Sequence, residues 1–134
     1  MKMQKAKLRY IKCIEQDDFW DIGDDSPYFF YATDGSALTK QGPWDLNEGE
    51  SKTLDRVYTF ENSLWIKPRE SDGGKTKDET GGSLFFGQKK YLPKHAAHFL
   101  ELPVKVKTEK SFVAKVGDGK FEYAFTFLPP GEEF

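Results

Sequence analysis

Cysteine and histidine are scarce in this 134-residue chain, which contains one cysteine and two histidines. A single thiol excludes an internal disulfide and a cysteine-rich zinc site. Cys13 stands between Lys12 and Ile14 in a strand-like run, so we expect a buried structural thiol and not a nucleophile. His95 and His98 have no cysteine near them, and we expect packing or surface roles for both.

Long hydrophobic runs are also missing. The longest apolar run is Tyr28–Ala32, far shorter than the roughly 20 residues that span a bilayer. Met1–Lys7 is positively charged, but the apolar core of a signal peptide does not follow it, which favours the cytoplasm by default. The net charge is only −2, from 20 basic and 22 acidic side chains, and the balance argues against a nucleic-acid partner.

The motifs of common enzyme classes do not occur. The sequence has no P-loop, no G-x-G-x-x-G and no G-x-S-x-G pattern. Paired carboxylates can hydrolyse glycosides, but a chain of this length offers little protein to build a deep cleft around them. We therefore expect a protein that is not an enzyme and has no catalytic residues.

Aromatic residues are abundant, with 12 Phe, 6 Tyr and 3 Trp. Apolar residues never repeat at helical spacing over three turns, and most apolar runs are short and separated by turn residues. The clearest strand, Phe121–Phe127, alternates aromatic and mostly polar residues and can pair with Phe112–Val116 across Gly117–Gly119. Other strand-like runs are Leu8–Ile14, Tyr28–Thr33, Leu54–Phe60, Ser63–Pro68, Leu84–Phe86 and Pro103–Lys107, and Lys94–Leu102 is a candidate short helix.

This pattern predicts an all-β fold, an antiparallel β-sandwich of about eight strands. We expect one domain over residues 1–134, with a core at about residues 6–128. Residues 129–134, which are rich in proline and glutamate, are expected to leave the domain as a tail.

Carboxylates gather in two segments between strand-like runs. The first has five aspartates and no basic residue, and the second lies among glycines. The members are Asp17, Asp18, Asp21, Asp24 and Asp25 in the first segment, and Glu70, Asp72, Asp78 and Glu79 in the second. Like charges held close together repel, and Ca²⁺ relieves this by taking 6–8 oxygen ligands. Solvated acidic loops that bind no metal are the alternative.

The spacing of the second segment resembles a known calcium loop. Glu70, Asp72, Asp78 and Gly81 follow a strand-like run in the pattern acid, one residue, Asp, five residues, Asp, two residues, Gly. This is similar to the third calcium loop of C2 domains, the calcium- and phospholipid-binding β-sandwiches, with Glu in place of the usual first Asp. The first segment leads into Gly23–Phe29, which resembles the Gly-x-Ser-Asp-Pro-Tyr motif of that family with Asp25 and Ser26 exchanged.

The resemblance covers Leu8–Phe86 and implies a divergent C2-like domain that binds Ca²⁺ between two loops. It implies a set of carboxylate ligands, with further carboxylates as possible substitutes. The ligands are Asp18, Asp25, Glu70, Asp72 and Asp78, and the possible substitutes are Asp17, Asp24 and Glu79. Leu38–Ser51 has no clear match to the Thr-x-x-Asn-Pro-x-Trp turn of the family.

Three apolar residues interrupt the first acidic segment. Phe19, Trp20 and Ile22 can enter a membrane interface once calcium neutralises their neighbours, or they can fold back over the end of the sandwich. The resemblance implies calcium-dependent attachment to an anionic membrane surface or another partner. The competing hypothesis is a metal-independent module that binds a protein or a glycan through exposed aromatics.

Overall fold

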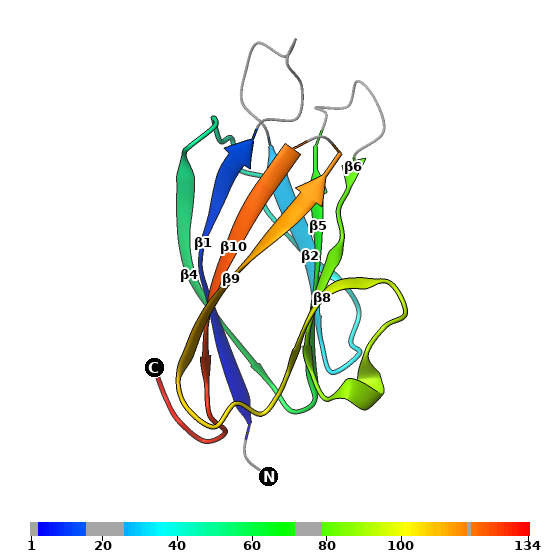
Figure 1. Ribbon diagram of the computed structural model, residues 1–134, viewed down its shortest axis with the longest axis vertical. Coiled ribbons are helices and arrows are strands. Elements are labelled where there is room, and N and C mark those ends of the chain that lie inside the picture. Colours follow the sequence, from blue (N-terminus) through cyan, green and yellow to red (C-terminus); the bar gives the residue numbers. More distant parts are fainter. Residues whose placement is uncertain (1–2, 16–25, 72–78, 118) are drawn as a thin grey trace.

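The structure is a computed structural model that describes residues 3–15, 26–71, 79–117 and 119–134. These residues form two stacked sheets, shown in Figure 1. The elements are β1 (Gln4–Glu15), β2 (Pro27–Thr33), β3 (Thr39–Gln41), β4 (Ser51–Phe60), β5 (Ser63–Glu70), β6 (Glu79–Thr80), β7 (Ser83–Gly87), η1 (Lys89–Tyr91), β8 (Ala96–Glu101), β9 (Thr108–Val116) and β10 (Gly119–Leu128). The prediction of an all-β sandwich is confirmed.

Strand order defines the two layers. One sheet has four strands in the order β4-β1-β10-β9, and the other has six, with the order β3-β2-β5-β7-β8 and β6 paired to β5. Neighbouring strands run antiparallel except β7 and β8, which are parallel. Residues 88–95, which include η1, carry the chain back to the starting end of β7, so that β8 runs in the same direction.

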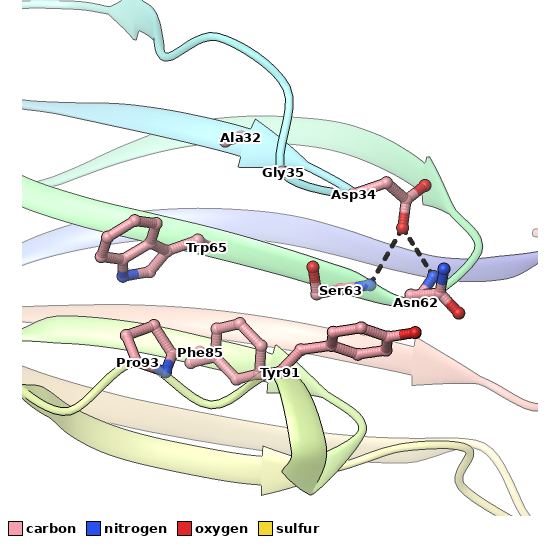
Figure 2. Close-up of a pocket in the computed structure, with 9 residues that line it drawn as sticks. All are labelled: Ala32, Asp34, Gly35, Asn62, Ser63, Trp65, Phe85, Tyr91 and Pro93. Carbon is pink, nitrogen blue, oxygen red and sulfur yellow. Dashed lines mark hydrogen bonds between the residues drawn. The ribbon is translucent and has the colours of Figure 1, made fainter.

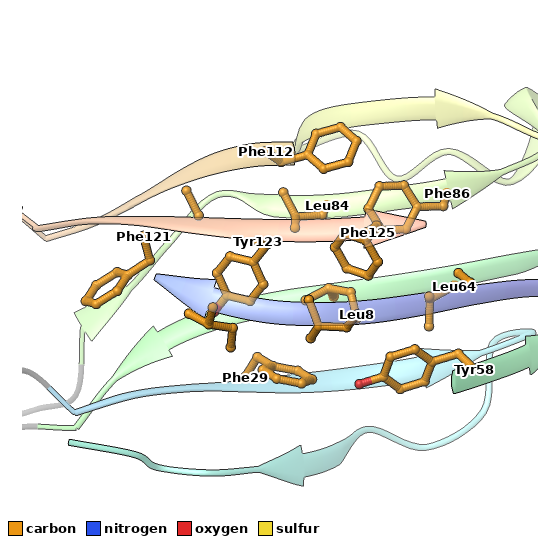
Figure 3. Close-up of a cluster of buried hydrophobic side chains, with 14 of the residues drawn as sticks. Leu8, Phe29, Tyr58, Leu64, Leu84, Phe86, Phe112, Phe121, Tyr123 and Phe125 are labelled. Atoms are coloured by element: carbon orange, nitrogen blue, oxygen red, sulfur yellow. The ribbon is translucent and has the colours of Figure 1, made fainter. Parts of the chain in front are cut away.

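The core fills the space between the sheets with aromatic rings (Figure 3). The alternation predicted for the last strand is confirmed, because its four aromatic residues are fully buried: Phe121, Tyr123, Phe125 and Phe127. Phe86 from the other sheet packs against this row, with its ring centroid 4.9 Å from that of Phe125 and 5.0 Å from that of Phe127. Both contacts are edge-to-face, an arrangement that adds about 0.5–1.5 kcal/mol beyond the buried area.

Two local predictions are wrong. Lys94–Leu102 is not a helix, because Ala96–Glu101 forms β8 and pairs with β7. Pro103–Lys107 is not a strand, and Val106 is 69% exposed. Pro103 has no N–H to donate to a ladder, which disfavours a strand there. The only helix among the described residues, η1, is three residues long, so none of them forms a helix that could span a membrane.

The C-terminal residues do not leave the domain as the sequence indicated. The N–H of Gly131 donates to the carbonyl of Met3 at 3.2 Å, and Glu133 forms an ion pair with Lys5. The ring of Phe134 lies under the ammonium of Lys7, 4.7 Å from its centroid. These contacts hold the tail against β1, since its aromatic and acidic side chains match the lysines there.

Candidate functional site

The strand ends that border the two acidic segments lie together at one end of the sandwich. The first segment connects β1 to β2, and the second connects β5 to β6. β2 and β5 are antiparallel neighbours in which Pro27 lies opposite Glu70. The N–H of Ser71 donates to the carbonyl of Ser26 at 2.9 Å, so the chain enters one segment where it leaves the other. Figure 1 shows these strand ends at the top of the view.

Glu70 is the one proposed ligand whose side chain the structure describes. It ends β5 and is 3% exposed. Its position in the strand alternation matches that of the core residues Leu64 and Ile66, so its carboxylate belongs to the inner face of the six-stranded sheet. The structure therefore places this carboxylate at the end of the core, between the segments that carry the other proposed ligands.

The remaining predicted site residues lie outside the described residues or are described only in part. Glu79 begins β6 and is paired with Glu70, but only its backbone is described. Those outside the described residues are Asp17, Asp18, Asp24, Asp25, Asp72 and Asp78 among the proposed ligands and substitutes, and Phe19, Trp20 and Ile22 among the proposed contact residues.

A third segment contributes a carboxylate that the sequence did not indicate. The N–H of Trp44 donates to the carbonyl of Pro27 at 3.1 Å, and Asp45 accepts a hydrogen bond from the Ser26 hydroxyl at 2.8 Å. Gly42 permits this arrangement, since a Cβ there would lie 2.8 Å from the Trp44 ring. The signal in the sequence was the turn-forming Gly42-Pro43 before Trp44, but nothing in the spacing indicated that it leads to Ser26.

Gly81, the last residue of the motif, ties the second segment to the opposite sheet. Its N–H donates to the carbonyl of Pro68 at 2.9 Å, and it forms an isolated bridge with Val116 of β9. A Cβ at this position would lie 2.6 Å from the Val116 side chain. The position therefore requires glycine for a close approach of the two sheets at the acidic end.

Within the described ranges, no group of three or more His, Cys, Asp or Glu side chains is arranged to hold a metal ion. His98 accordingly has a packing role, with Nε2 2.9 Å from the carbonyl of Val113 and its ring 5.7 Å from that of Phe112. Cys13 is fully buried, as the sequence predicted.

A cationic face lies beside the acidic end. On the outer side of the six-stranded sheet, basic groups of β3 and β5 lie over aromatic rings of β2 and β5. The pairs are Lys40 over Tyr28 at 4.5 Å from the ring centroid, Lys67 over Trp65 at 4.9 Å and Arg69 over Phe30 at 5.3 Å. The strands β2 and β3 contain no carboxylate, so this face, defined by Lys40, Lys67 and Arg69, carries positive charge. The sequence analysis missed this face because its members come from three separate strands.

Comparison with known proteins places the fold. No family model and no curated protein sequence matches the chain. Among solved structures, the first C2 domain of plant Extended Synaptotagmin 1 aligns with 98% of this chain and 97% of its own length, with a TM-score of 0.51 and 10% identity. The chain has a C2-like fold.

Two longer structures contain the same fold as one part. The calcium-bound pair of C2 domains of Extended-Synaptotagmin 2 aligns over 95% of this chain, with a TM-score of 0.56 and 15% identity, and the chain spans 45% of that structure. Human GIVD cytosolic phospholipase A2 aligns over 95% of this chain, with a TM-score of 0.53 and 12% identity, and the chain spans 17% of it. At such identities the likeness establishes the C2-like fold alone.

Proposed function

We propose that this C2-like chain is a non-enzymatic module that binds Ca²⁺ between its two acidic segments and then attaches to anionic membrane phospholipid. The observation that carries the proposal is the pairing of Pro27 with Glu70 and of Ser26 with Ser71, which brings the ends of both segments together. The similar Extended-Synaptotagmin 2 structure is calcium bound, and the acidic segments here resemble C2 calcium loops.

The proposed ligands are Asp18, Asp25, Glu70, Asp72 and Asp78, with Asp17, Asp24 and Glu79 as possible substitutes. Carboxylate oxygens suit a hard cation, and Ca²⁺ tolerates the irregular geometry that two loops offer. Binding neutralises the repulsion among the carboxylates. A coordination position that the protein leaves open can accept a phosphate oxygen from a lipid headgroup.

Membrane contact has two proposed parts. Phe19, Trp20 and Ile22 enter the headgroup region from the first segment, where an aromatic belt is favoured. The cationic face meets anionic headgroups, and each basic side chain near such a surface contributes about 1 kcal/mol. Before calcium binds, the acidic end repels the same surface, so calcium switches the net interaction from repulsive to attractive.

Co-sedimentation with phosphatidylserine vesicles tests the proposal. We expect the wild-type chain to sediment in calcium and to stay in solution in EDTA. The double variant Phe19→Ala and Trp20→Ala should bind calcium but remain in the supernatant. Phe134→Ala is the matched control, because it removes an exposed aromatic ring that packs on Lys7 away from the acidic end. A wild-type chain that binds calcium and ignores the vesicles would refute the membrane role.

A further inference from the structure

A pocket of about 390 Å³ lies at the other end of the six-stranded sheet, on its outer face. It is lined by the ends of β2 and β5, by β7 and by the η1 segment (Figure 2). β2 runs from Pro27 at the acidic end to Thr33 beside the pocket, a length of about 20 Å. The pocket is therefore separate from the proposed calcium site, and its volume falls within the range of roughly 300–1,000 Å³ found for small-ligand sites.

Aromatic and apolar side chains make up most of the pocket. Trp65 and Phe85 are direct neighbours across β5 and β7, and Tyr91 and Pro93 approach them from the η1 segment. Phe85 is almost fully buried, whereas Tyr91 is 46% exposed and forms part of the rim. The pocket can thus cover the apolar face of a ring-shaped ligand.

Polar groups gather at one end of the pocket. Asp34 holds this end rigid, since its carboxylate accepts hydrogen bonds from the backbone N–H groups of residues 61–63 at 2.6–3.1 Å. The side chains of Asn62 and Ser63 make no hydrogen bond within the described part of the chain, and neither does the Tyr91 hydroxyl. Figure 2 shows this hydroxyl directed toward Asn62. All three groups can both donate and accept hydrogen bonds.

Charged ligands fit this chemistry poorly. The protein's own ammonium groups already lie over the aromatic walls, with Lys67 4.9 Å from the centroid of Trp65 and Lys90 5.2 Å from that of Tyr91. They would repel a cation that approached the rings. The carboxylate of Asp34 opposes an anion at the polar end. A neutral ligand remains.

A proline-rich peptide fits poorly as well. Aromatic grooves that bind such peptides cradle an extended polyproline helix, and an indole N–H commonly donates to the peptide carbonyls. The Trp65 Nε1 atom is buried from solvent and cannot reach an incoming carbonyl. The hydrogen-bonding groups instead lie together at one end of a closed-off pocket.

We infer that the pocket binds a neutral pyranose ring, the sugar unit of a glycan. A pyranose has an apolar C–H face that packs on Trp65 and Tyr91, and its hydroxyls donate and accept as the free groups of Asn62, Ser63 and Tyr91 do. This binding does not depend on calcium or on the proposed membrane attachment.

Nuclear magnetic resonance with the full chain tests the inference. The probes are methyl pyranosides of glucose, galactose, mannose and N-acetylglucosamine, each in calcium and in EDTA. We expect saturation transfer to at least one of them in both buffers. Backbone amide shifts should change at Gly35, Asn62, Ser63 and Tyr91, and not at Ser26 or Ser71 beside the acidic segments.

Variants separate the pocket from other aromatic surfaces. Tyr91→Ala and Asn62→Ala should each weaken sugar binding about threefold to tenfold, and Tyr91→Phe should weaken it less because it keeps the ring. Phe134→Ala is the matched control, since Phe134 is exposed to the same degree as Tyr91, 45% against 46%, and should bind like the wild type.

Three outcomes would overturn the inference. They are the absence of saturation transfer to any of the four pyranosides, binding that Tyr91→Ala leaves unchanged, and amide shifts that map away from the pocket. A proline-rich peptide that shifts the pocket amides when no pyranoside does would assign the pocket to a peptide instead. Because the calcium titration is a separate measurement, failure here leaves the proposed function standing.

Discussion

The two ends of the six-stranded sheet use carboxylates in opposite ways. At the pocket end, one carboxylate, Asp34, is satisfied by three backbone N–H groups of a two-residue connection between β4 and β5. At the acidic end, the sequence places five aspartates in residues 17–25 with no basic residue among them. The first arrangement stabilises a turn within the fold. The second concentrates negative charge, for which we propose a cation as the partner.

The largest expected effect is on the turn. Asp34→Ala removes three hydrogen bonds to a charged acceptor and places alanine at a positive φ of 53°. We expect a loss of about 3 kcal/mol in the free energy of unfolding, measured by urea denaturation.

Asp45→Ala is the control for that variant, since Asp45 accepts a single exposed hydrogen bond from Ser26. Its cost should stay at about 0.5 kcal/mol or less. Equal costs for the two variants would show that the two ends do not differ in this way.

Calcium should stabilise the acidic end by a similar amount. A ligand that binds only the folded state adds about 2.7 kcal/mol at a hundredfold excess over Kd. The melting temperature should rise by several degrees in calcium relative to EDTA, and less in magnesium, which demands stricter octahedral geometry. An identical melting curve in EDTA and in calcium would argue that the acidic segments are only solvated loops.

Between the two ends, a pair of buried tyrosines separates hydrogen bonding from packing. The Tyr58 hydroxyl donates to Oε1 of the buried Gln41 at 2.6 Å, whereas the Tyr123 hydroxyl is buried with no hydrogen-bond partner in the described structure. Tyr58→Phe should cost about 1.5 kcal/mol, because it leaves the Gln41 oxygen unsatisfied. Tyr123→Phe should be neutral or slightly stabilising in the same urea assay. A larger cost for Tyr123→Phe would contradict this assignment.

Alkaline pH should weaken this interior by a smaller amount. Burial raises the pKa of both Tyr58 and Tyr123 above the ordinary value for tyrosine. Their raised pKa values mean that the unfolded chain ionises first, so stability is complete below about pH 10 and falls as the pH rises further.

Roughly 1 kcal/mol per tyrosine should be lost about one unit above that pH, and Tyr123→Phe should lose less than the wild type. Urea unfolding at about pH 8 and about pH 11 measures the difference. Equal pH dependence in the two proteins would rule out Tyr123 as a source.

The sequence predicted the layered fold because strand alternation records burial directly. Phe121–Phe127 alternates with period two, and its aromatic face is buried as that pattern requires. Where tertiary pairing decides the structure, local patterns were misleading. Ala96–Glu101 became a strand by pairing with β7, and the tail residue Phe134 was held by Lys7 of β1.

The candidate site was predictable only in part. The spacing from Glu70 to Gly81 pointed to a calcium loop, and the strand pairing brings its start beside the first segment. The Asp45 contact, the cationic face and the pocket were not predictable. Each combines residues from separate strands or turns, and no spacing along the chain encodes those contacts.

Calorimetric titration of calcium into the metal-free chain, with Asp72→Asn beside the wild type, tests the central claim most directly. The wild type should give saturable binding, and Asp72→Asn should weaken it at least about tenfold by removing one ligand charge. In EDTA the variant should be as stable as the wild type or slightly more so, because repulsion among the carboxylates falls. No heat of binding for the wild type, or equal affinity in the two proteins, would contradict the account.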